Sequence, residues 1–142
     1  MIEADLLAKV ELFQDLDQQE LESIARIATA KIYEDGDAIL REGERGTHFG
    51  IILFGRAQVA KNMGAARPTV LATLGEGDVF GEEAILGWGF RSASVVAWGP
   101  VQCAFLGQWD VLAVLVAHPE KSVKFLQRLR GRYSAQRTKQ LA

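Results

Sequence analysis

The distribution of glycine limits what this chain can fold into more than any other feature of its sequence. Thirteen of its fourteen glycines lie between Gly36 and Gly107, where they separate short runs of β-branched and aromatic residues. Glycine with Asp, Asn and Pro is typical of tight turns. Many short strands at regular spacing indicate a sandwich or a barrel. We therefore expect strands in seven segments, 30–33, 38–41, 48–54, 56–61, 69–74, 93–98 and 101–106.

Helical patterns flank this glycine-rich region on both sides. Asp17 and Glu20 have the spacing of a capping box, which predicts a helix that runs to about residue 28. A shorter helix over roughly 3–12 precedes it.

After Gly107 the pattern is helical again. It predicts a short apolar helix over 110–117, and Pro119 suits the first turn of a last helix over 119–136. On that last helix we expect one apolar face, formed by Val123, Leu126, Leu129 and Tyr133.

A loop near the end of the glycine-rich region carries residues suited to hold a small anion. Gly81 allows a close approach of the backbone or a positive φ. Arg91 can hold a phosphate by two parallel charge-assisted hydrogen bonds, and Ser92 offers a further donor. Glu82 only accepts hydrogen bonds, so it fits a ligand with a hydroxyl beside the phosphate.

This constellation resembles the phosphate-binding cassette of the cyclic-nucleotide-binding domain family. In that family a Gly-Glu pair is followed, after a short helix, by Arg-(Ser/Thr/Ala)-Ala. The resemblance implies that Glu82 accepts the ribose 2′-hydroxyl and that Arg91 holds the cyclic phosphate. The donors it implies around them are Gly81, Ala84, Ser92 and Ala93. It also implies that Arg132 or Tyr133 contacts the purine.

The family resemblance also implies the fold, because the segment 43–59 resembles the glycine-marked core of the family's β-roll. We expect a mainly β protein with flanking helices, a double-stranded β-helix (jelly-roll) barrel. The chain would be a single cyclic-nucleotide-binding domain over 1–142. Its expected parts are N-terminal helices over 1–29, a β-roll over 30–107 with the cassette at 80–93, and two C-terminal helices, a hinge and a lid, over 108–142.

Three functions stay open at this point. The first is a non-catalytic regulatory domain that binds a cyclic nucleotide and signals to a partner through movement of the C-terminal helices. Cyclic AMP is favoured over cyclic GMP, because Arg-Ser-Ala resembles the bacterial cyclic-AMP regulators. The second is an interaction module of the same shape that has lost the ligand, because Glu83 stands where the family usually has an aliphatic residue. The third is a truncated regulator whose DNA-binding part is absent.

Charge and composition bear on possible partners. From Glu120 onward seven basic residues accompany one acidic residue, a net charge of +6, so the rest of the chain carries −8. We interpret the basic run as a solvated helix face and expect no DNA binding, since no second recognition helix follows it. The expected partners are a cyclic nucleotide and either a separate effector protein or a second copy associated through the helices.

Several classes of protein are not expected. Only His48, His118 and Cys103 are available for nucleophilic or metal chemistry, so we expect neither an enzyme nor a metal centre. His48 is interpreted as a surface or edge residue and Cys103 as a buried, inert thiol. The sequence has no run of about 18 apolar residues, so we expect no membrane span. The acidic, amphipathic N-terminus and the single cysteine favour a cytoplasmic location.

Overall fold

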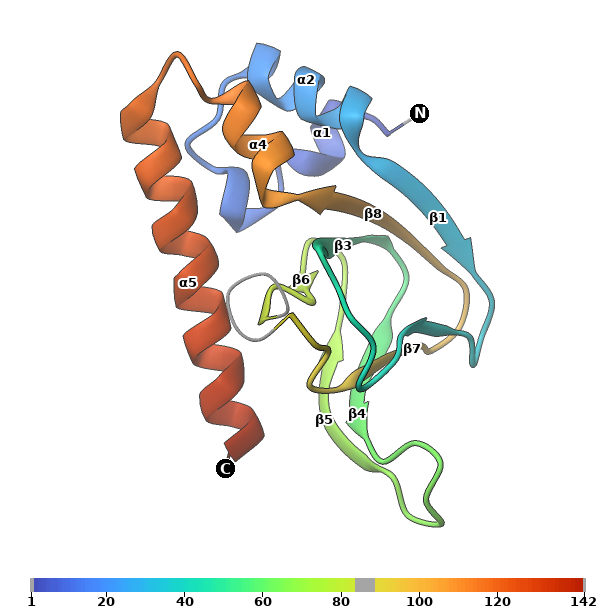
Figure 1. Ribbon diagram of the computed structural model, residues 1–142. Helices are drawn as coiled ribbons and strands as arrows, with labels where there is room; N and C mark the ends of the chain where they lie inside the picture. The colour runs from blue at the N-terminus through green and yellow to red at the C-terminus, as the bar shows by residue number, and fades with distance from the viewer. Residues whose placement is uncertain (1, 84–88, 142) are drawn as a thin grey trace.

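Two four-stranded antiparallel sheets form a β-roll, which confirms the jelly-roll fold (Figure 1). The computed structural model describes residues 2–83 and 89–141, and side chains as far as Gly131. One sheet has the order β1-β8-β3-β6 and the other the order β2-β7-β4-β5. The strands are β1 (Thr29–Tyr33), β2 (Ala38–Leu40), β3 (His48–Phe54), β4 (Ala57–Lys61), β5 (Thr69–Leu74), β6 (Val79–Phe80), β7 (Ser94–Ala97) and β8 (Val101–Gly107).

All seven segments expected from the sequence are strands, and no end differs from the expected end by more than one residue. The two-residue strand β6 was not expected, because a strand of that length has no alternating pattern of its own. It pairs with β3 at Gly50 and Ile51. A Cβ at Gly50 would collide with the Phe80 ring, so glycine is required where these two strands pack.

The helices gather at one end of the β-roll and along its side (Figure 1). They are α1 (Ala4–Leu7), the 3₁₀ helix η1 (Glu11–Phe13), α2 (Gln18–Ile27), α4 (Gln108–Val114) and α5 (Pro119–Leu141). The last helix begins at Pro119 as expected, and its backbone continues through Gly131 to Leu141.

The single helix expected over 3–12 is wrong. The chain forms α1 and η1 instead, and Val10 between them has an extended backbone. Leu7, Val10, Leu12 and Phe13 are all buried. One continuous helix would direct these side chains to different sides, so the break allows all of them to reach the core.

Caps fix the beginnings of two helices. The Glu20 N–H donates to Asp17 Oδ1 at 2.9 Å and the Asp17 N–H donates to Glu20 Oε1 at 2.8 Å, which confirms the capping box of α2. The helix α4 begins two residues earlier than expected. Asp110 is its third residue rather than its first, and its Oδ2 accepts from the Gly107 N–H at 3.0 Å.

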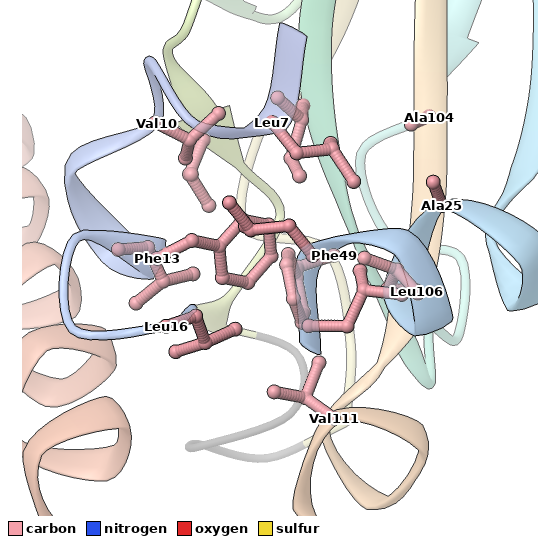
Figure 2. Close-up of a cluster of buried hydrophobic side chains, with 14 of the residues drawn as sticks. Leu7, Val10, Phe13, Leu16, Ala25, Phe49, Ala104, Leu106 and Val111 are labelled. Carbon is pink, nitrogen blue, oxygen red and sulfur yellow. The ribbon is translucent and has the colours of Figure 1, made fainter. Parts of the chain in front are cut away.

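Two apolar clusters form the core. The first joins the helices to the sheet of β3 and β8, and Figure 2 shows Phe13, Phe49, Leu106 and Val111 converging there. The second lies inside the β-roll and includes Cys103, whose pKa is raised to about 12 by burial. The thiol is therefore buried and protonated near neutral pH, as the sequence predicted.

Helix α5 is attached to the N-terminal helices through both apolar and ionic contacts. The ring of Phe125 lies 6.4 Å, centroid to centroid, from the Phe13 ring, and Leu129 is wholly buried. Arg128 Nε donates to Asp15 Oδ2 at 2.8 Å. A second ion pair joins Lys121 to the cap of α2, where its Nζ lies 2.6 Å from Glu20 Oε1.

The apolar face expected on α5 is partly wrong. Val123 is 54% exposed, and Phe125 takes its place beside Leu129 in the core. Phe125 and Leu129 are four residues apart and therefore share one face of the helix. Leu126 packs at the edge of the same cluster, and the side chain of Tyr133 lies outside the described residues.

Candidate functional site

Gly81 begins the loop that the sequence assigned to anion binding. Its φ is +77°, a backbone conformation that side chains other than glycine rarely adopt. A Cβ at this position would lie 2.8 Å from Arg91 Nη1 and 2.9 Å from Leu40 Cδ1. Glycine is therefore needed both for the turn and for the close approach of the arginine.

Arg91 lies with its side chain buried against two backbone carbonyls. Its Nη1 donates to the Gly81 oxygen at 2.6 Å and its Nη2 donates to the His48 oxygen at 2.8 Å. Only 7% of the residue is exposed. Hydrogen bonds from a charged donor are stronger than neutral ones, so the two carbonyls fix the direction of the guanidinium.

The connection between β2 and β3 holds the backbone of Arg91 on its other side. The Arg91 N–H donates to the Glu44 oxygen at 2.7 Å, and the Arg91 oxygen accepts from the Gly43 N–H at 2.8 Å. A Cβ at Gly46 would collide with the guanidinium itself. The arginine is thus enclosed by backbone from two segments that are far apart in the sequence, residues 43–48 and Gly81.

Acidic side chains surround this arginine. Glu82 follows Gly81 directly and is wholly buried. Burial lowers the pKa of Arg91, whereas the negative charges of Glu83, Glu82 and Glu44 raise it, Glu83 most strongly. A guanidinium with its pKa lowered from 12.5 stays charged at neutral pH, so a buried positive charge lies next to acidic side chains.

The remaining expected positions follow the loop. Ser92 is half-buried, and its Oγ lies 3.5 Å from Glu83 Oε1. Ala93 is buried and directly precedes β7. Ala84 lies outside the described residues. The structure thus brings Gly81, Glu82, Arg91 and Ser92 into one loop region.

The two residues expected to contact a purine are on α5. The helix backbone includes Arg132 and Tyr133, but their side chains lie outside the described residues. Their contact with a base stays a prediction.

Three residues of the site, His48, Gly46 and Glu44, were not expected from the sequence. His48 is exposed at the first position of β3, as expected, and contributes only its carbonyl oxygen. Backbone groups are common to all residue types, so His48 and Glu44 left no signal. Gly46 gave a signal, because glycine permits close approach, but Arg91, which it contacts, lies 45 positions further along the chain.

A series of contacts runs from Arg91 to the start of α4. His48, which accepts from the guanidinium, lies opposite Gly107 in the β3–β8 pairing. The Gly107 N–H in turn donates to the Asp110 carboxylate that caps α4. The loop that carries Gly81 and Arg91 is therefore joined to the helix by three consecutive backbone or side-chain contacts.

Similarity to known proteins identifies the family. The family model for the cyclic nucleotide-binding domain matches residues 30–118, which include α4 and all of the β-roll except Thr29. The chain belongs to this family. The match covers Gly81, Glu82 and Arg91, in the order that the resemblance required.

Curated relatives include protein kinases and their regulators. The chain is 34% identical over 97 residues to the cGMP-dependent protein kinase egl-4 of Caenorhabditis elegans, an alignment that covers 68% of this chain and 12% of the kinase. It is 38% identical over 104 residues to the cAMP-dependent protein kinase regulatory subunit of Debaryomyces hansenii, covering 73% of this chain and 22% of that subunit. The chain thus matches only a small part of these relatives.

A solved structure shares the fold over most of the chain. The regulatory domain of Toxoplasma gondii PKA, co-crystallised with cAMP, is similar to this chain with a TM-score of 0.74 and 27% identity. The similarity covers 92% of this chain and 48% of that one. The family's β-roll and its flanking helices are therefore both present here.

Metal sites and membrane spans each have a recognisable arrangement of residues. Among residues 2–83 and 89–141 no cluster of His, Cys, Asp or Glu has the arrangement of a metal site. No helix in that part of the chain has the length and hydrophobicity to cross a membrane.

Proposed function

We propose that this domain is a non-catalytic cytoplasmic sensor that binds a cyclic nucleotide, cyclic AMP in preference to cyclic GMP. The observation that carries the proposal is the buried guanidinium of Arg91, fixed by the Gly81 and His48 carbonyls next to the buried Glu82. A guanidinium has five N–H donors, so it can donate to a phosphate, which then competes with the two carbonyls for these donors. Glu82 would accept the ribose 2′-hydroxyl.

The preference for cyclic AMP is supported by the Arg91-Ser92-Ala93 sequence and by the regulatory-subunit relative. That relative is a regulator of a cAMP-dependent kinase, and its identity to this chain is 38%, against 34% for the cGMP-dependent kinase. In this proposal Arg132 or Tyr133 closes over the purine.

Signal transmission would use the attachment of α5. A phosphate that binds Arg91 competes with the His48 carbonyl for the hydrogen bonds of the guanidinium. His48 pairs with Gly107 between β3 and β8, and the Gly107 N–H donates to the Asp110 carboxylate that caps α4. Movement of α4 then changes how α5 packs on the N-terminal helices, and a separate effector or a second copy reads the change. The ligand shifts the population between two helix arrangements, because it binds one of them better.

Calorimetry with cyclic AMP and cyclic GMP tests the proposal. We expect binding of both, tighter for cyclic AMP, and loss of binding in Arg91→Ala. Arg56→Ala is the matched control, because Arg56 packs over the Trp98 ring, away from the loop. No detectable binding at millimolar nucleotide would reject the sensor.

A second candidate is an interaction module that keeps the shape but binds no nucleotide. The contact of Glu83 with Ser92 favours it, because a carboxylate then stands next to the hydroxyl expected to donate to a phosphate. This candidate predicts that the helices bind a partner protein with the same affinity in wild type and in Arg91→Ala.

A further inference from the structure

Glu83 places a negative charge at the proposed phosphate position. Its Oε1 lies 3.5 Å from Ser92 Oγ, at the long limit of a hydrogen bond, and Ser92 follows Arg91 directly. Of the carboxylates that act on Arg91, Glu83 acts most strongly. The carboxylate therefore shares its immediate surroundings with the groups that would bind a phosphate.

We infer that Glu83 is a specificity-determining residue that limits the charge of the ligand, admitting a singly charged phosphodiester and disfavouring a doubly charged phosphomonoester. This inference rests on the proposed function, because it assigns the phosphate to Arg91 and Ser92. A cyclic nucleotide and the 5′-monophosphate of the same nucleoside carry the same base and ribose. They differ in the ring that the diester closes through the 3′-oxygen and in the charge of the phosphate, which is about −1 in the diester and approaches −2 in the monoester at neutral pH. Comparing each ligand between wild type and a variant separates the effect of charge from that of the ring.

The size of the discrimination follows from Coulomb's law. A carboxylate and a phosphate that both lie beside the Ser92 hydroxyl, whose single O–H can donate to only one of them, have charge centres about 6 Å apart. With the dielectric constant of water, repulsion at that distance weakens binding about threefold for one ligand charge and about tenfold for two. The site is partly buried, so these factors are lower limits, and the diester gains at least about threefold over the monoester.

A mutant series with two ligands tests the inference. Calorimetry measures the affinity of wild type, Glu83→Gln and Glu76→Gln for cyclic AMP and for 5′-AMP. Glu83→Gln keeps the size of the side chain and removes its charge. Glu76→Gln is the matched control, since Glu76 is exposed in the turn before β6 and is not among the charges that act on Arg91.

We expect Glu83→Gln to bind both ligands more tightly, with an increase in affinity for 5′-AMP at least about threefold larger than the increase for cyclic AMP. Glu76→Gln should change neither affinity. Equal gains for the two ligands, or no gain, would overturn the inference while leaving the sensor intact if wild type binds cyclic AMP. If wild type binds neither ligand but Glu83→Gln binds both, Glu83 excludes both ligands and does not select between them, so the inference and the proposed function of the natural chain both fail.

If no variant binds either nucleotide, both the inference and the proposed function are rejected. Glu83→Ala removes the same charge and replaces Glu83→Gln should that variant fail to fold, which thermal unfolding of each protein establishes beforehand.

Discussion

Replacing Gly46 by alanine perturbs the site without removing any group proposed to touch the ligand. The new methyl group would occupy the space of the Arg91 guanidinium, so the arginine has to move away from the Gly81 and His48 carbonyls. A hydrogen bond from a charged donor contributes about 1.5–3 kcal/mol. Because Arg91 is buried, solvent does not replace these bonds, and we expect a loss of about 2 kcal/mol for one bond and about 4 for both.

Thermal and denaturant unfolding measure this loss, and calorimetry with cyclic AMP measures its effect on binding. For a chain of this length 1 kcal/mol corresponds to roughly 3 °C in Tm, so Gly46→Ala should lower Tm by about 6–12 °C. Gly64→Ala is the control, because nothing lies within 4 Å of the position that its added methyl group would take, and the φ of Gly64 is not positive. If the two variants unfold at the same temperature, Arg91 is not enclosed by residues 43–48 and Gly81.

Two further predictions concern α5 and the barrel interior. The hydrogen bond from Arg128 lowers the pKa of Asp15 below 3.8, so the stabilisation from this pair is complete above the unfolded-state value and is lost as the pH falls through the folded-state value. Denaturant unfolding of wild type and Asp15→Asn should therefore differ at pH 7 and converge in strong acid, and a constant difference would contradict this account. Because burial raises the pKa of Cys103 to about 12, a thiol reagent at pH 8 should modify it only after unfolding, whereas rapid modification of the folded protein would show that the thiol is accessible.

Local signals were sufficient for seven of the eight strands of the β-roll. Glycine and its turn partners mark the ends of each run, so the strand limits follow from residues close in the sequence. Where the structure differs from the expectation, long-range packing decides. Val10 breaks the expected first helix because Leu7 before it and Leu12 after it both have to reach the core, and Phe125 rather than Val123 faces Phe13. Neither the break at Val10 nor the contact of Phe125 with Phe13 can be recognised from a short window of sequence.

The candidate site, too, could be predicted only in part from the sequence. The residue types of Gly81, Glu82 and Arg91 indicated an anion with a neighbouring hydroxyl, because each type has a limited hydrogen-bonding chemistry. The partners that fix Arg91 could not be predicted, since two of them are carbonyls from distant segments, and any residue can supply a carbonyl. Glu83 was visible as a departure from the family pattern, but its contact with Ser92 needed the folded loop.

Binding and signalling share the His48 carbonyl, and this makes them inseparable in the proposed sensor. The carbonyl accepts from Arg91, and His48 pairs with Gly107, whose N–H reaches the cap of α4. In this proposal, any change that moves the guanidinium also acts on α4, whether it is a phosphate or the methyl group of Gly46→Ala. A ligand can shift the helices only by the difference in its affinity for their two arrangements. Because the guanidinium is fixed before the ligand arrives, this difference in affinity depends on how strongly the phosphate and the His48 carbonyl compete for Arg91.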